Sequence, residues 1–252
     1  MNFDGKRVLI TGSSRGIGRE IARQFAANGA RVAVHYGHDE ASARVTRDAL
    51  DGDGHSIHGG DMADADAVRA LVDGAASALG GLDILVNNAG IYHEHDIPAM
   101  DYAAWGAVWS RTLAVNLVGS ANAIFCAVPH MMAAGGGRVV NVSSRGAFRG
   151  EPTAPAYGAS KAGMNAMGQS LAVALAPHNI FVATVAPGFV QTDMAADILD
   201  SERGAAIREQ SPLGRVATPE EVAYTVLFLA AEQTAFLTGC IVDVNGASYL
   251  RS

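Results

Sequence analysis

The chain has 252 residues, of which 49% are hydrophobic and 17% charged, and its formal net charge is −7. Such a composition is typical of a globular protein with a sizeable core, and an acidic chain without a long basic run is not expected to bind nucleic acid or an anionic membrane. Two cysteines are too few for a disulfide framework. The opening MNFDGKRVLITG leads almost directly into a strand and lacks the pattern of a leader, so we expect a cytoplasmic protein.

Short apolar or β-branched runs alternate with longer segments of helical period along the chain. The runs that predict strands are RVLIT (7–11), RVAVHY (31–36), HSIHG (55–59), LDILVN (82–87), RVVNVS (138–143), IFVATVA (180–186) and CIVDVN (240–245). The segments that predict helices are 17–28, 40–50, 64–79, 101–133, 156–176 and 219–231. This alternation predicts βαβ units and a parallel sheet that is covered by helices on both faces.

No linker, charge block or internal repeat divides the chain, so we predict a single domain over residues 1–252. The segment 188–216 is the main interruption of the rhythm, and we predict it as a long connection after a strand. Connections of this length in compact domains are often functional lids.

A glycine-rich stretch, LITGSSRGIGREIA, joins the first predicted strand to the first predicted helix. Gly12, Gly16 and Gly18 permit a tight turn and let backbone N–H groups approach a pyrophosphate at the helix N-terminus. The same glycines would also suit a turn that only connects a strand to a helix. Their place between the first strand and a helix favours dinucleotide binding.

The stretch AYGASKAG contains Tyr157 and Lys161, which are four residues apart and therefore lie on one face of a helix. Their ordinary pKa values, ~10 and ~10.4, make neither side chain useful alone at neutral pH. Held together, the ammonium would stabilise the phenolate and lower the pKa of the tyrosine. The spacing by itself fits both an acid/base pair and a helix that carries the two residues by chance.

Five motifs, in order along the chain, together resemble those of the short-chain dehydrogenase/reductase family. They are TGSSRGIG (11–18), NNAG (87–90), VNVSS (140–144), YGASK (157–161) and PGFVQTDM (187–194). Within the family the chain is most similar to the 3-oxoacyl-carrier-protein reductase-like branch, and the likeness extends to FLTGCIVDVNG near the C-terminus. The resemblance implies an α/β fold, namely a Rossmann-type doubly wound parallel sheet of about seven strands.

The resemblance also implies a nicotinamide-dependent oxidoreductase with the catalytic residues Asn116, Ser144, Tyr157 and Lys161. Tyr157 is the expected general acid/base for hydride transfer between nicotinamide and a carbonyl or secondary alcohol. Lys161 is expected to lower the pKa of Tyr157 and hold the nicotinamide ribose, and Ser144 to orient the carbonyl oxygen. Asn116 is expected to anchor a water next to Lys161; the alternative is an asparagine that only satisfies backbone groups.

The family pattern places a cofactor site along the carboxyl ends of the strands. Asn88, Ala89 and Gly90 are expected on the adenosine side, with Asp61 and Met62 at the adenine ring. The full expected set is Gly12, Ser14, Arg15, Gly16, Ile17, Gly18, Tyr36, Asp61, Met62, Asn88, Ala89, Gly90, Tyr157, Lys161, Pro187, Gly188, Val190 and Thr192. Asn87 is expected to tie strands together instead, and no metal site is expected.

The end of the second strand predicts a preference for NADP(H), although NAD(H) stays open. Enzymes of this fold that prefer NAD usually carry an acid there, and this chain carries Tyr36. Asp39 and Glu40 follow and are expected to open the next helix. Arg15 puts a positive charge near the adenosine ribose, where it can pair with a 2′-phosphate. His35 and His38 are considered as further sources of partial charge.

The expected substrate is a 3-oxoacyl thioester or another ketone, and the alternative is a sugar or polyol. A nucleotide sensor without catalysis is disfavoured because this chain keeps both Tyr157 and Lys161. Where the 3-oxoacyl branch has basic residues for an acidic acyl carrier, this chain offers only His130 and His178, so a carrier partner is doubtful. Family members usually form tetramers, and we expect a homotetramer.

The segment 91–115 is about one helical turn longer than is usual in that branch. It carries Tyr92, His93, Glu94 and His95 close to the expected mouth of the site, where polar lining is a better interpretation than metal binding. Arg145, Phe148 and Arg149 directly follow Ser144, and we considered them as substrate contacts.

Overall fold

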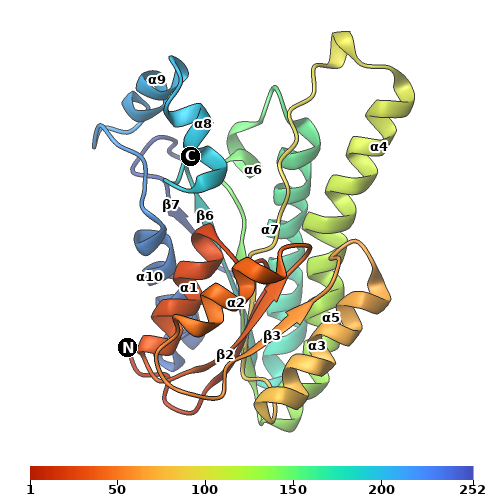
Figure 1. The fold of residues 1–252 in the computed structure, drawn as a ribbon, viewed down its shortest axis with the longest axis vertical. Helices are drawn as coiled ribbons and strands as arrows, with labels where there is room; N and C mark the ends of the chain where they lie inside the picture. Colours follow the sequence, from red (N-terminus) through yellow and green to blue (C-terminus); the bar gives the residue numbers. More distant parts are fainter. Residues whose placement is uncertain (252) are drawn as a thin grey trace.

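The computed structural model describes residues 1–251, without the side chains of Asp193 and Met194, so Ser252, the last residue of the predicted domain, lies outside the described residues. Within this range seven strands form one parallel sheet in the order β3-β2-β1-β4-β5-β6-β7 (Figure 1). The strands are β1 (Arg7–Ile10), β2 (Arg31–Tyr36), β3 (Ser56–Gly59), β4 (Ile84–Asn87), β5 (Gly137–Val142), β6 (Ile180–Pro187) and β7 (Ile241–Val244). The predicted doubly wound α/β fold is therefore confirmed.

Helices cover both faces of the sheet (Figure 1). One face is covered by α1 (Gly16–Ala27), α2 (Glu40–Asp48) and α10 (Pro219–Ala230), and the other by α3 (Ala65–Leu79), α5 (Gly119–Ala133) and α7 (Pro155–Leu175). Alternate strand residues enter the two cores: Val8 and Ile10 pack toward α1, whereas Leu9 packs toward α3. Burial on both faces explains why the strands are continuous apolar runs.

The long predicted helix 101–133 is interrupted in the structure. It consists of α4 (Tyr102–Leu113), a π-helical turn (Ala114–Val118) and α5, in one continuous path. Such π-turns inside helices occur frequently at functional sites. By length and composition alone this stretch could cross a membrane, with 44% of its apolar 18-residue window buried. Its α5 half packs against α3 and the sheet, as a core helix does.

The predicted connection 188–216 contains two helices that the sequence pattern did not predict. They are α8 (Asp193–Leu199) and α9 (Arg203–Glu209), and each is too short to show a clear helical period. The short helix α6 (Gly146–Arg149) and three short 3₁₀ turns were also not predicted as elements of their own. Those turns are Ile97–Ala99, Ala176–His178 and Glu232–Leu237.

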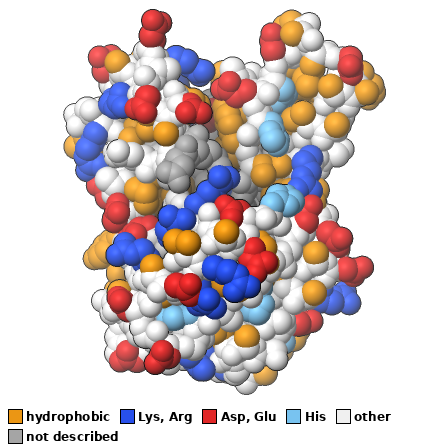
Figure 2. All heavy atoms as spheres, viewed as in Figure 1, with side chains coloured by type: hydrophobic (Ala, Val, Ile, Leu, Met, Phe, Trp, Pro, Cys, Tyr) orange, Lys and Arg blue, Asp and Glu red, His pale blue; other side chains and the backbone are white. Residues whose placement is uncertain are grey.

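The strand order reverses at β1, which pairs with β2 on one side and β4 on the other. Ligands of doubly wound sheets bind at the carboxyl ends of the strands, beside such a reversal. At this end of the sheet two parts of the molecule project, α4 on one side and α8 with α9 on the other (Figure 1). The space-filling view shows the surface hollowed between them (Figure 2).

Candidate active site

The catalytic residues predicted from the motifs come from three neighbouring elements. Ser144 follows β5, whereas Tyr157 and Lys161 lie one turn apart on α7. The Ser144 hydroxyl accepts the Gly146 N–H at 3.0 Å and acts on the Tyr157 hydroxyl, whose pKa it lowers. The Lys161 ammonium donates to the Val142 carbonyl at 2.8 Å and lies 5.8 Å from the centre of the Tyr157 ring. The structure therefore brings together the hydroxyl pair and the amine.

Burial shifts the two titratable groups of this centre in opposite directions. It raises the pKa of Tyr157 to about 12, mainly through desolvation, and the Ser144 hydroxyl only partly offsets this. Burial also lowers the pKa of Lys161 to about 8. The expectation that the tyrosine pKa is lowered is therefore wrong for this arrangement, because desolvation and the charge of Glu151 raise it. Tyr157 is a protonated phenol at neutral pH, the form that can donate a proton.

Asn116 lies in the π-turn, and its side chain is fully engaged with its surroundings. Its Oδ1 accepts from the Ile91 N–H at 2.8 Å, and its Nδ2 donates to the Ile91 carbonyl at 3.0 Å and to Ser160 Oγ at 3.1 Å. A Cβ added at Gly90 would lie 3.4 Å from Lys161 Nζ and 3.5 Å from Asn116 Oδ1. Asn116 thus holds the loop after β4 against Lys161, which agrees with the backbone-satisfying alternative.

The glycine loop turns between β1 and α1 as predicted. Gly12 has φ +64°, and a Cβ there would lie 2.9 Å from the Cα of Ala89. A Cβ at Gly18 would collide with the Gly12 carbonyl. Across the cleft, a Cβ at Gly16 would lie 3.6 Å from Thr192 Cγ2, so the glycine loop faces the segment after β6. The shape suits a pyrophosphate held between them, and the residues fit a dinucleotide.

Side chains beside this loop brace it rather than leave it free. The Asn88 amide donates to the carbonyls of Thr11 and Gly12, both at 2.9 Å. Arg19 donates to the Ser14 carbonyl at 2.7 Å, and Ile17 packs against the core. Asn87 donates to Asn141 Oδ1 at 3.0 Å across β4 and β5, as expected of a residue that ties strands.

At the end of β2, where the adenosine ribose of a dinucleotide is expected, the structure has an exposed arginine, Arg15, and a tyrosine, Tyr36, whose hydroxyl is already hydrogen-bonded. Arg15 is exposed at the start of α1, and its charge contributes to the lowered pKa of Asp39. Asp39 caps α2 through the Ser42 N–H, as predicted. Tyr36 donates its hydroxyl to Glu40 at 3.0 Å, and Glu40 is also paired with Arg44. The acid near the end of β2 is therefore neutralised by an arginine.

His35 does not supply charge to this end of the cleft, contrary to the interpretation from sequence. Its ring accepts the Gly12 N–H at Nδ1 (2.9 Å), so its Nε2 carries the proton toward the Gly60 carbonyl (2.9 Å). Burial lowers its pKa. A neutral histidine fixed between two backbone groups holds the glycine loop beside β3.

The predicted adenine pair lies directly after β3. Asp61 accepts from the Ala63 N–H at 2.9 Å and forms an ion pair with Arg111 of α4 at 2.8 Å, and Arg111 lowers its pKa. Met62 is buried. On the other side of the cleft, Gly188 donates to the Val244 carbonyl and Val190 bridges to Ala217.

Three comparisons with known proteins agree with this geometry. A family model described as Enoyl-(Acyl carrier protein) reductase matches residues 12–247. The 3-oxoacyl-(acyl-carrier-protein) reductase FabG of Aquifex aeolicus is 37% identical, over 99% of both chains, and that of Staphylococcus aureus is 37% identical over 97% of this chain and 98% of its own. The chain belongs to the short-chain dehydrogenase/reductase family. It is an oxidoreductase of this family, which implies a nicotinamide cofactor.

A solved structure supports the same membership. The crystal structure of a dehydrogenase/reductase from Sinorhizobium meliloti superposes with a TM-score of 0.90 at 32% identity, and the match covers 99% of this chain and 97% of that one. The resemblance stated from the motifs is thereby confirmed, together with the 3-oxoacyl reductase-like branch.

The mouth of this short-chain dehydrogenase/reductase site contains Tyr92, which the sequence analysis expected there, and Glu151, which it did not indicate. Tyr92 lies edge-on to Tyr157, with ring centres 5.1 Å apart, and its hydroxyl is 3.3 Å from Thr153 Oγ1. Glu151 is partly buried, burial raises its pKa, and its charge raises the pKa of Tyr157. Its only sequence signal is its place in the 12-residue interval between Ser144 and Tyr157.

The loops around the mouth are joined to the α8–α9 segment by polar contacts. Arg203 at the start of α9 lies 3.8 Å from Glu94, and Gln210 at its end accepts from both Arg145 and Arg149 at 2.7 Å. Arg145 also donates to Ser248 and is 4% exposed. Its guanidinium therefore binds the segment after α9 and the C-terminal region. The sequence analysis instead predicted that Arg145 contacts the substrate.

Proposed function

We propose that this enzyme uses NADP(H) to reduce the ketone of a 3-oxoacyl thioester or a related small ketone, with Tyr157 as general acid/base. The observation that carries the proposal is the set of Ser144, Tyr157 and Lys161 beside the end of β5, in the same sheet whose first strand leads into a glycine loop shaped for a pyrophosphate. The nicotinamide supplies the hydride when bound. The protein must then orient the carbonyl and deliver one proton.

Each of the three side chains has a separate task in this proposal. Ser144 donates its hydrogen bond to the carbonyl oxygen and holds it near Tyr157. Tyr157 gives its proton to that oxygen as negative charge develops there. The ammonium of Lys161 stabilises the phenolate that is left. A pKa of about 12 for Tyr157 and about 8 for Lys161 provides the protonated forms of both groups at neutral pH.

The preference for NADP(H) is supported by the charges at the ribose end. Arg15 is exposed there, and the two acids after β2 are both engaged: Glu40 is paired with Arg44 and bonded to Tyr36, and Asp39 caps α2 through the Ser42 N–H. A 2′-phosphate would therefore meet the Arg15 guanidinium at the end of β2.

Replacement of Arg15 with alanine is expected to raise the KM for NADPH about tenfold or more and to leave the KM for NADH nearly unchanged. The reason is that a charge-assisted hydrogen bond contributes ~1.5–3 kcal/mol and NADH has no 2′-phosphate. Steady-state kinetics with both cofactors measure the effect, and Arg69→Ala, on the exposed side of α3, is the control. Equal losses for both cofactors would contradict the assignment.

The substrate class follows from the relatives and from the surface. The FabG relatives are named as reductases of 3-oxoacyl groups on an acyl carrier protein, which supports a 3-oxoacyl substrate here. A carrier partner is poorly supported, because His130 at the end of α5 is bonded to Asp73 at 2.8 Å and the exposed His178 adds no permanent charge. A CoA-linked or free ketone is therefore the proposed substrate.

A polyol or sugar is the second candidate, and Glu151 favours it. A partly buried carboxylate beside Tyr157 can accept hydrogen bonds from substrate hydroxyl groups. The deciding experiment is an assay of acetoacetyl-CoA, small diketones, quinones and polyols with each cofactor. NADPH oxidation with acetoacetyl-CoA supports the leading proposal, whereas activity confined to polyol oxidation supports the second. No turnover with any of these compounds would contradict both.

Removal of the Glu151 charge is expected to shift the pH profile of alcohol oxidation to lower pH. Oxidation needs Tyr157 as the phenolate, and the Glu151 charge raises the pKa of Tyr157, so Glu151→Gln lowers it. At a fixed pH below the pKa of Tyr157, a larger fraction of the variant has the phenolate, so its rate of alcohol oxidation should be a few-fold higher than that of the wild type. Glu94→Gln is the matched control, because Glu94 acts on Tyr92 and not on Tyr157. An unshifted Glu151→Gln profile would be evidence against this coupling.

The homotetramer remains part of the proposal and is supported by exposed apolar side chains on α5 and α7. Phe125 and Val173 are 76% and 79% exposed in the single chain. Light scattering is expected to give four times the 26.0 kDa chain mass, and Phe125→Glu a smaller particle. Val45→Glu on α2, where Val45 is also exposed, should leave the mass unchanged. A wild-type mass of one chain would refute the tetramer.

A further inference from the structure

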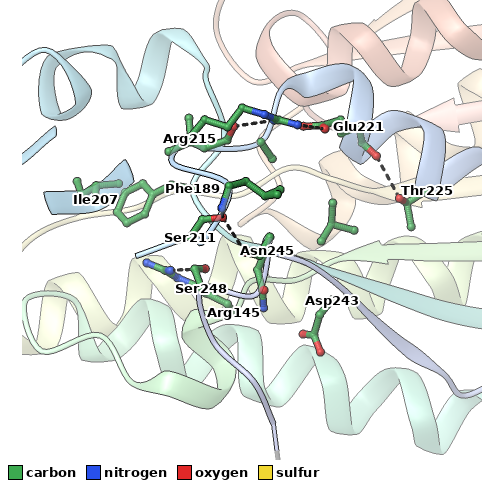
Figure 3. A pocket seen from close by; sticks show the side chains of 15 residues that line it. Arg145, Phe189, Ile207, Ser211, Arg215, Glu221, Thr225, Asp243, Asn245 and Ser248 are labelled. Carbon is green, nitrogen blue, oxygen red and sulfur yellow. Dashed lines mark hydrogen bonds and ion pairs between the residues drawn. The ribbon is translucent and has the colours of Figure 1, made fainter. Parts of the chain in front are cut away.

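A cavity of about 270 Å³ lies beside Arg145, the residue after Ser144, on the side of the C-terminal region (Figure 3). Its wall is formed by Arg145, by Phe189 after β6, and by residues of the segment after α9 and of the loop after β7. Ser144, Tyr157 and Lys161 do not line it. The cavity is therefore separate from the proposed site of hydride transfer, although its wall includes neighbours of both Ser144 and Gly188.

Arg145 lines this cavity and is in none of the ion pairs among the residues that the structure describes. Its Nη1 donates to Ser248 Oγ at 2.6 Å and its Nη2 to Gln210 Oε1 at 2.7 Å, and both partners are neutral. None of the carboxylates that the structure describes forms an ion pair with it, although it is only 4% exposed. The charge of Glu151 acts on Arg145 from farther away, but it does not offset burial, which lowers the pKa of Arg145. A buried guanidinium without a close ion pair is costly, and an anion in the cavity would reduce that cost.

The other charges on the wall are already neutralised. Arg215 is paired with Glu221 at 2.7 Å, as Figure 3 shows, and Asp243 is paired with Arg251 at 2.7 Å. Neither acid therefore competes for Arg145, and neither pair leaves a free charge to attract a cation. The unbalanced charge of the cavity is positive and is located at one end of it.

The remaining wall is largely apolar. Phe189 lies beside Arg145, with the guanidinium carbon 5.1 Å from the ring centre, and Ile207, Leu213 and Val216 also line the cavity. The volume is slightly below the ~300–1,000 Å³ of pockets for drug-sized ligands. A planar guanidinium at one end matches a carboxylate, and the apolar wall matches a short hydrocarbon chain.

We propose that this cavity is a second ligand site that binds a small monocarboxylate with a short apolar chain, whose carboxylate pairs with Arg145. Such a ligand would contact the residue after Ser144 and, through Arg145, the Gln210 contact at the end of α9. The site is thus placed to sense an acyl-type carboxylate next to the catalytic centre without using that centre.

The test is calorimetric titration of the full-length protein with hexanoate, 1-hexanol and hexylamine, which share one chain length and differ in the head group. Hexanoate is expected to bind at least about tenfold more tightly than either of the other two, because only it forms a charge-assisted pair with the guanidinium. Hydrogen exchange should show protection of residues 207–217 and 243–248 on addition of hexanoate. No turnover is measured, so a negative result here is distinct from failure of the proposed reaction.

Two variants separate this cavity from the rest of the cleft. Arg145→Gln keeps a hydrogen-bonding side chain and should weaken hexanoate binding about tenfold or more. Arg149→Gln is the matched control, because Arg149 donates to the same Gln210 oxygen but does not line the cavity, and it should bind as the wild type does. Equal binding of hexanoate and 1-hexanol to the wild type, or protection confined to the loops around Tyr157, would overturn the proposal even if Arg145→Gln does not fold.

Discussion

Replacement of Tyr157 with phenylalanine is expected to lower kcat for ketone reduction about 10³-fold, within the ~10²–10⁴-fold that a positioned general acid contributes. The ring is kept, so its edge-on contact with Tyr92 and the packing of α7 are unchanged. Only the hydroxyl on which Ser144 acts is lost. NADPH affinity, measured by fluorescence titration, should remain within a few-fold of the wild type.

The matched control is Tyr92→Phe, which removes the hydroxyl of the neighbouring ring. That hydroxyl is 3.3 Å from Thr153 Oγ1, and Tyr92 is the last of the causes that raise the pKa of Tyr157, so kcat should change only a few-fold. Substantial turnover by Tyr157→Phe, with Tyr92→Phe equally active, would show that another group delivers the proton. Both variants keep the apolar surface of the ring, so loss of folding is not expected.

The sheet and the catalytic constellation could be predicted because their signals are local. A buried parallel strand requires a short apolar run, and each of the seven predicted runs overlaps one strand of the structure, with ends that agree to within two residues. Tyr157 and Lys161 share a face of α7 because helical geometry fixes their spacing. The position of Ser144 follows from the end of β5, which lies two residues before it.

The direction of individual side chains near the site could not be predicted, since it depends on partners far away in sequence. Arg145 directly follows Ser144, yet its guanidinium binds Gln210 and Ser248, which are 65 and 103 residues away. His35 ends in a neutral state because Gly12 and Gly60 supply a donor and an acceptor on opposite sides of its ring. Neither the contacts of Arg145 nor the neutral state of His35 can be predicted from the neighbouring residues in the sequence.

The π-turn between α4 and α5 and the two short helices α8 and α9 could not be predicted from the sequence pattern either. The apolar periodicity of 101–133 continues through the π-turn, so nothing in it marks the extra residue that places Asn116 against Ile91. The helices α8 and α9 span seven residues each, too few for a period of 3.6 to be distinguished from chance. Arg203 of α9 contacts Glu94, and Gln210 directly after α9 accepts from Arg149, so this end of the segment is connected to the site mouth.

Replacement of Lys161 with methionine is expected to lower kcat for reduction about 10²–10³-fold and to remove its dependence on pH near 8. In the wild type, burial lowers the pKa of Lys161 to about 8, so the ammonium is present below that pH and is lost above it. The ammonium stabilises the phenolate that Tyr157 becomes after it gives up its proton. The wild-type rate of reduction should therefore fall as the pH rises through about 8.

The chain offers a clean control for this prediction, because Lys6 and Lys161 are its only lysines. Lys6 is paired with Glu232 at 2.7 Å on the surface, and Lys6→Met should keep both the wild-type kcat and its fall near pH 8. With isotopically labelled lysine, NMR should show one of two side-chain resonances titrating near 8, and Lys161→Met should remove that resonance. If both resonances titrate near the ordinary lysine value of ~10.4, or Lys161→Met keeps the same pH profile, Lys161 does not control the proton transfer.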